Sequence, residues 1–98
     1  MRPKPIKGED LLKIISVALN RGRVIPSSHF RQRMRERNFD MADAITVLDG
    51  AKQVRQVWNG KARCWNYDIQ GKDIEGEDFT IRIAPGEDVT GIVLVTGF

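Results

Sequence analysis

The spacing of the apolar residues changes near the middle of this chain. Up to about residue 50 they recur three and four positions apart, as on one face of a helix, and beyond it they alternate in short runs separated by turn residues. Helices in one half and strands in the other are typical of an α+β fold. We predict about three N-terminal helices packed on a four-stranded antiparallel sheet, in a single domain over residues 8–98 that follows a flexible basic arm, residues 1–7.

Each predicted helix is bounded by residues suited to begin or end one. These are Gly22 after the first helix, Ser27 or Ser28 before and Asn38 after the second, and Asp40 with Asp43 before and Gly50 after the third. The second helix should bury Phe30 and Met34. The third should bury Ala44, Ile45 and Leu48.

The predicted strands cover residues 53–58, 62–69, 79–83 and 91–96. Asn59-Gly60 is a hairpin signal between the first two, and longer turns are expected at 70–77 and 85–88. Along 62–69, alternation places Trp65, Tyr67 and Ile69 on one face. Because 91–96 is apolar throughout, it should be an interior strand covered on both faces.

A basic block over residues 21–37 is the most unusual feature of the composition. It holds six arginines, one glutamate and no lysine, a local charge of +5, together with the only histidine of the chain. The guanidinium group presents a rigid fork of donors that fits phosphate oxygens. Residues 1–37 carry +7 and residues 38–98 carry −4, so one end of the molecule should attract anions.

His29, Arg33 and Arg37 are spaced to form one stripe of the second helix, beside the apolar edge. In the first turn, the helix dipole and the nearby arginines disfavour a protonated imidazole, so we expect His29 to be mostly neutral at pH 7. A neutral imidazole can accept the proton of a ribose 2′-hydroxyl while arginines hold the phosphate. Packing or capping is the alternative role of His29, and acidic side chains are alternative partners of Arg33 and Arg37. Arg31 and Arg35 point elsewhere, as surface cations that add to phosphate binding.

The second helix resembles the signature of a bacterial domain family of unknown function. The matching residues read Ser28-His29-Phe30-x-x-Arg33-Met34-x-x-Arg37-Asn38, and the similarity extends over about residues 24–98. That family is itself weakly similar to the RelE-like toxin superfamily of small α+β ribonucleases. The resemblance implies a RelE-like fold, a toxin-type domain that binds RNA, and a protein antitoxin that covers the basic face.

RelE-like ribonucleases often use an aromatic or acidic residue near the C-terminus, whereas this chain ends in Thr96-Gly97-Phe98. Tyr67 is the only phenol that could replace such a residue, and its alternative role is packing beside Trp65. Trp58 is a candidate for base stacking, or else packs at the strand edge.

The sequence therefore predicts an RNA-binding domain in which His29, Arg33 and Tyr67 would serve metal-independent cleavage, with no cofactor. One histidine and one cysteine give no metal-ligand cluster, and the single cysteine and the lack of a signal peptide or membrane span point to the cytoplasm. One alternative is a non-catalytic module whose cationic helix docks an acidic protein partner. Another is a structural homodimer that uses an exposed sheet face.

Overall fold

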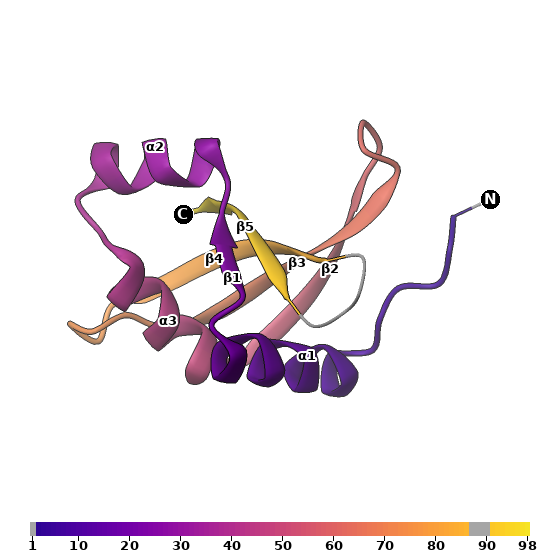
Figure 1. Ribbon diagram of the computed structural model, residues 1–98, viewed down its shortest axis with the longest axis horizontal. Helices are drawn as coiled ribbons and strands as arrows, with labels where there is room; N and C mark the ends of the chain where they lie inside the picture. Colours follow the sequence, from indigo (N-terminus) through magenta and orange to yellow (C-terminus); the bar gives the residue numbers. More distant parts are fainter. Residues whose placement is uncertain (1, 87–90) are drawn as a thin grey trace.

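The computed structural model describes residues 2–86 and 91–98, which form three helices and five strands (Figure 1). In chain order these are α1 (Gly8–Arg21), β1 (Val24–Pro26), α2 (Ser28–Arg37), α3 (Met41–Asp49), β2 (Gln53–Asn59), β3 (Cys64–Lys72), β4 (Asp78–Pro85) and β5 (Ile92–Gly97). The α+β class is confirmed. Within the described residues no helix has the length and apolar character needed to cross a membrane.

The predicted helix ends are confirmed by the backbone geometry. Gly22 and Asn38 end α1 and α2 in the left-handed conformation, with φ of 67° and 56°. The Ser27 hydroxyl accepts a hydrogen bond from the Phe30 N–H, and Asp40 and Asp43 form a reciprocal capping box at the start of α3. Residues next to each helix therefore account for these ends, whereas α1 begins at Gly8 without a side-chain cap.

The sheet is mixed, with the strand order β1-β5-β4-β3-β2, so the prediction of four antiparallel strands was incomplete. Strands β2 to β5 do form an antiparallel meander. The missed strand, β1, pairs in parallel with β5 through Val24↔Ile92 and Pro26↔Leu94. Three residues before a helix are too few to carry an alternating pattern, and their partner strand lies far along the chain. No local pattern therefore predicts β1.

Two turns differ from the predicted ones. The hairpin between β2 and β3 is a four-residue loop, because Asn59 pairs with Cys64, and the Asn59 side chain accepts hydrogen bonds from the N–H groups of Lys61 and Ala62. The predicted turn over 70–77 is shorter, since β3 continues to Lys72. A Cβ on Gly71 would lie 2.7 Å from the carbonyl oxygen of Val47, so this glycine permits a close approach of α3 rather than a turn. The turn predicted at 85–88 lies partly outside the described residues.

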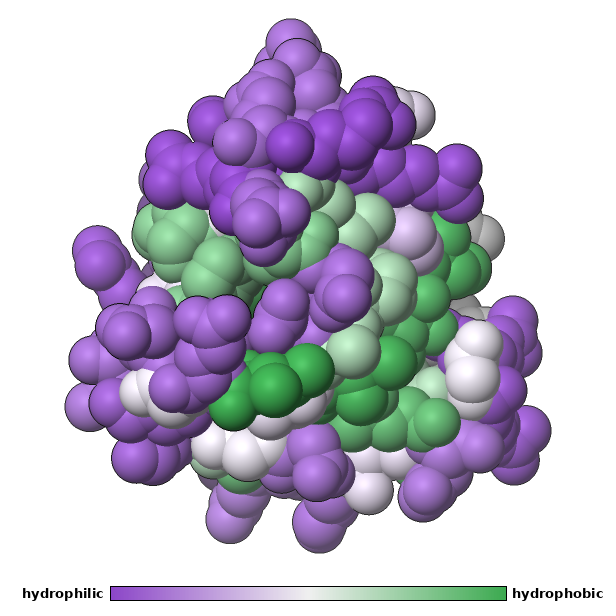
Figure 2. All heavy atoms as spheres, turned by 90° about the vertical axis from the view of Figure 1, so that its left-hand side faces the viewer, coloured by the Kyte–Doolittle hydropathy of each residue, from purple (hydrophilic) through white to green (hydrophobic). Residues whose placement is uncertain are grey.

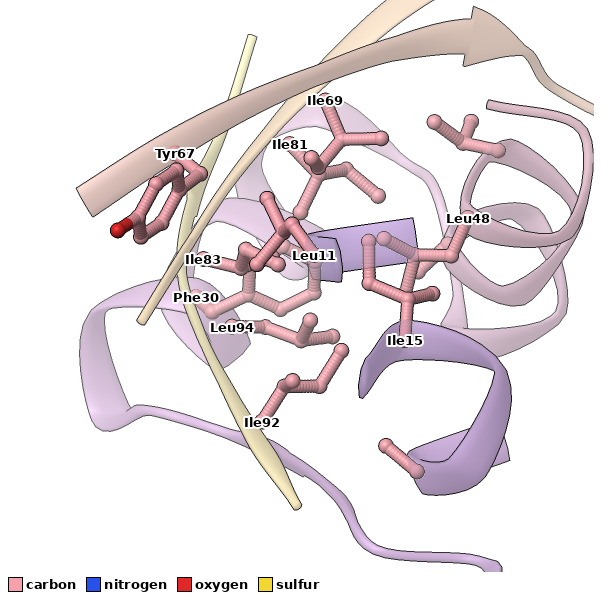
Figure 3. Close-up of a cluster of buried hydrophobic side chains, with 13 residues drawn as sticks. Leu11, Ile15, Phe30, Leu48, Tyr67, Ile69, Ile81, Ile83, Ile92 and Leu94 are labelled. Atoms are coloured by element: carbon pink, nitrogen blue, oxygen red, sulfur yellow. The ribbon is translucent and has the colours of Figure 1, made fainter. Parts of the chain in front are cut away.

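The core lies between the three helices and one face of the sheet (Figure 3). It contains Leu11, Ile15, Ala18, Phe30, Ala44, Val47, Leu48, Tyr67, Ile69, Ile81, Ile83, Ile92 and Leu94. Two assignments of helix faces were wrong in part. Val47 is buried in place of Ile45, which is 43% exposed, and Met34 is half-buried at the edge of the core.

The other face of the sheet has a different composition. The registers Val57↔Asn66, Arg55↔Asp68 and Asp68↔Arg82 place these polar and charged side chains opposite the core. Val93 and Val95 of β5 are half-buried there, so β5 is interior by strand order but is not deeply covered on both faces. This outer face is the surface beside which α2 begins.

Candidate functional site

A hollow of about 340 Å³ lies where the first turn of α2 meets the outer face of the sheet. Its lining is contributed by α2, the end of β2 with the following loop, and β3, β4 and β5: His29, Val57, Trp58, Asn59, Gly60, Asn66, Arg82, Val95 and Thr96. We call it the His29 hollow. It combines an imidazole, an amide, a guanidinium and an indole in one open depression.

Ser27 fixes the position of His29 above this hollow. Its N–H donates to the carbonyl oxygen of Leu94 at 2.9 Å, and its hydroxyl donates to that of Val95 at 3.0 Å. The same hydroxyl caps α2 by accepting the Phe30 N–H. The first turn of α2 is thus attached to β5, and the exposed His29 side chain, two residues further on, is held beside that strand.

Arg82 is held rigidly in the hollow by Asp68. The Arg82 Nε and Nη2 atoms donate to the two carboxylate oxygens at 2.7 and 3.1 Å, a bidentate pair between neighbouring strands. Asp68 raises the pKa of Arg82, first by accepting its hydrogen bond and then by its negative charge. The guanidinium also lies 5.6 Å from the centre of the Phe98 ring. Arg82 is therefore a fixed cation, and its Nη1 forms no hydrogen bond with any residue that the structure describes.

The predicted cationic stripe reaches the hollow only at its first residue. Arg33 is one turn from His29 but does not line the hollow, and it pairs with Glu36 at 3.6 Å. Its Nε is buried and has no hydrogen-bond partner among the described residues. Arg37 is exposed at the last turn of α2, further away.

Tyr67 is not brought to His29. It faces the core side of β3, is 2% exposed, and its hydroxyl accepts a hydrogen bond from the Ile6 N–H at 2.8 Å. Asn66, the preceding residue of β3, points to the hollow instead. The placement of Tyr67 fits its packing role, close to the predicted arm, where Pro3 accepts a hydrogen bond from the Trp65 indole.

Sequence reasoning missed Asn66 and Arg82, which line the hollow with His29, and Asp68, which the sheet register pairs with Arg82. A signal was present, because these polar residues alternate with the apolar residues of β3 and β4. Two more basic residues were overlooked: Lys61 and Arg63 are exposed in the loop that follows Asn59 and Gly60. Within the described part of the chain, no three metal-ligating side chains cluster together.

The other flank of α2 lines a separate hollow of about 480 Å³, which is mostly apolar. Pro26, Met34, Phe39 and Met41 supply its apolar lining, and Arg31, Arg35 and Asp40 complete it. We call it the methionine groove. Arg31 and Arg35, expected as surface cations that add to phosphate binding, therefore border an apolar surface. Figure 2 shows apolar side chains exposed at this end of the molecule.

A family model matches residues 27–96, from the cap of α2 to the end of β5. The chain belongs to the domain of unknown function family DUF4258. The matched segment contains every residue that lines the His29 hollow. No curated protein and no solved structure matches the chain.

Proposed function

We propose that this DUF4258 domain is a RelE-like RNA-binding domain that cleaves RNA at the His29 hollow without a metal ion. The observation that carries the proposal is the shared hollow, in which a histidine and a fixed arginine face the same space. Metal-independent cleavage of RNA needs this pair of groups: a base for the 2′-hydroxyl and a cation for the phosphate.

In the proposed reaction the His29 imidazole accepts the proton of a ribose 2′-hydroxyl. The 2′-oxygen attacks the adjacent phosphorus, and the bond from phosphorus to the 5′-oxygen breaks. That oxygen takes a proton from a water molecule, and the proton held on His29 neutralises the hydroxide that remains. The products are a 2′,3′-cyclic phosphate and a 5′-hydroxyl. Arg82 Nη1 would bind a non-bridging oxygen, where negative charge grows in the transition state.

The surroundings of the hollow suit an RNA strand. Trp58 lines the hollow and packs edge-to-face on Trp65, and the Arg2 guanidinium lies 4.9 Å from its ring centre, where a stacked base would replace it. The Asn66 amide, which is 4% exposed, can donate to or accept from a base edge that enters the hollow. Arg33 is one helical turn from His29, and the exposed Lys61 and Arg63 follow Asn59 and Gly60, which line the hollow. The charges of Arg82 and Asp68 largely cancel at a distance. These other cations therefore provide the long-range attraction for the RNA phosphates.

RNA cleavage by purified protein and by His29→Ala tests this proposal. Loss of the general base should lower cleavage about 10²–10⁴-fold, with RNA affinity nearly unchanged. Chelators should have no effect, and a DNA copy of the substrate, which lacks the 2′-hydroxyl, should stay intact.

The matched control is Ser28→Ala, the adjacent exposed position on α2, which should retain activity. Equal cleavage by wild type and His29→Ala would remove the histidine from the mechanism. Intact RNA under all conditions, with binding retained, would reduce the proposal to RNA binding alone.

A further inference from the structure

We infer that the methionine groove is a docking site for an amphipathic, acidic helix of a protein partner. Phe39 forms the floor of the groove and is well packed. Its ring meets those of Phe30 and Phe79 edge-to-face, with 5.5 and 4.8 Å between the ring centres. Two unbranched side chains, Met34 and Met41, form its adaptable walls. A volume of about 480 Å³ accommodates a few apolar side chains of a partner.

The charges at the groove specify an acidic partner. Arg31 and Arg35 border it, are exposed, and form no ion pair with any residue that the structure describes. Glu36, the one acid of the basic block, is engaged elsewhere, by Gln32 at 2.8 Å and by Arg33.

The groove also contains one carboxylate, and its role is structural. Asp40 Oδ1 accepts the Asp43 N–H in the capping box of α3. Two unpaired guanidinium groups therefore dominate the rim, and carboxylates beside the apolar residues of a partner would complement them.

The neighbouring strand edge favours a helix over an added strand. Arg23 accepts from the Ile92 N–H and Ser27 donates to Leu94, so alternate residues of β1 face β5. The main-chain groups of Val24 and Pro26 therefore point away from β5, towards the open edge of the sheet. The proline has no N–H to donate there. Such a short edge, blocked by proline, offers too few main-chain hydrogen bonds for a β-strand.

The surface around the groove extends its apolar character. Ile45, one turn after the groove residue Met41 on α3, is 43% exposed. Figure 2, which faces the end of the molecule where α2 turns into α3, shows apolar side chains gathered below the hydrophilic side chains of α2. A helix with apolar residues at i, i+4 and i+7 matches an apolar surface that has a cationic border on one side. This inference does not rest on RNA cleavage.

The test uses the full chain with ¹³C-labelled methionine methyl groups, because Met34 and Met41 both line the groove. The probe is a helical peptide with leucine at i, i+4 and i+7 and glutamate on the remaining face. Titration should shift both methyl signals. The same peptide with lysine in place of glutamate should bind at least about tenfold more weakly, because like charges repel at the rim.

Charge reversal supplies a variant and a matched control. Arg31→Glu with Arg35→Glu should weaken binding of the glutamate peptide about tenfold, while Lys13→Glu with Lys61→Glu, an equal change of charge at exposed positions elsewhere, should change it less than about twofold. Circular dichroism checks the fold of both variants. Equal affinity for the two peptides, equal loss in both variants, or unmoved methyl signals at millimolar peptide would overturn the inference. Self-association of the protein that Met41→Lys abolishes would also overturn it, since a second copy would then occupy the groove.

Discussion

The two flanks of α2 carry the same charge and border surfaces of opposite chemistry. On one flank, His29 faces a polar hollow with Asn66 and Arg82. On the other, Arg31 and Arg35 border a groove of methionine, proline and phenylalanine. The arginine-rich helix therefore does not form a single electrostatic patch. The side chains that the fold places beside each arginine determine which ligand it can bind. The polar flank suits a phosphate ligand and the apolar flank suits a protein.

Substitutions at the buried apolar edge of α2, between the two flanks, should lower the stability of the protein most. Phe30 is fully buried, so Phe30→Ala should lower the free energy of unfolding by about 3–5 kcal/mol in a denaturant melt. Met34→Ala should cost only about 1–2 kcal/mol, because one side of Met34 already faces the groove. Equal losses would mean that Met34 is a core residue and that the groove is filled in solution.

The polar flank depends on the Asp68–Arg82 pair. Asp68→Asn removes the carboxylate and leaves Arg82 without its bidentate acceptor, which should cost about 1–2 kcal/mol, less than a fully buried pair because the Arg82 side chain is 31% exposed. The apolar flank should be insensitive to this change. Thermal melts, combined with the methionine methyl spectrum as a reporter of the groove, test both expectations. A shift of the Met34 and Met41 signals would show that the two flanks are coupled.

Salt dependence should separate the two pairs of arginines. Replacing Arg33 and Arg37 by glutamine should reduce the slope of log affinity for RNA against log salt by about 1–2, as expected for one or two lost phosphate contacts. The same change at Arg31 and Arg35 removes equal charge and should reduce the slope less. Filter binding at several salt concentrations measures both slopes. Identical slopes in the two variants would argue that RNA senses only the total charge of α2.

Replacing a single arginine on the apolar flank should change the stability of the protein least. Arg31 is exposed and makes no ion pair with a described residue, so Arg31→Ala should change the free energy of unfolding by less than about 0.5 kcal/mol. A denaturant melt checks this value. A loss above 1 kcal/mol would reveal a structural role of Arg31 in the groove.

Local chemistry explains why the helices could be predicted. Each capping residue acts on main-chain groups only a few positions away, as Ser27, Asn38 and the pair Asp40–Asp43 do. The local sequence is therefore enough to predict these helix ends. The site could not be predicted in the same way. Asp68 and Arg82 lie 14 residues apart and meet only through the register of β3 and β4, and His29 joins them because Ser27 binds β5, 68 residues further along the chain.

The missed strand and the two misjudged helix faces have a similar origin. β1 exists because β5 offers an edge, not because Val24–Pro26 has strand character of its own. On α3, the choice of Val47 over Ile45 depends on how the helix is rotated against β3. Periodicity identifies an amphipathic helix but does not fix its rotation to within one residue.

RNA should occupy the His29 flank of α2 and leave the methionine groove free. The most direct test of this placement is a titration of the isotope-labelled protein with a short single-stranded RNA that carries a 2′-O-methyl group to prevent cleavage. NMR signals of the His29 imidazole and the Trp58 indole should shift, and the Met34 and Met41 methyl signals should stay in place. Shifts confined to the two methionines, or no shift at His29 at saturating RNA, would contradict the account.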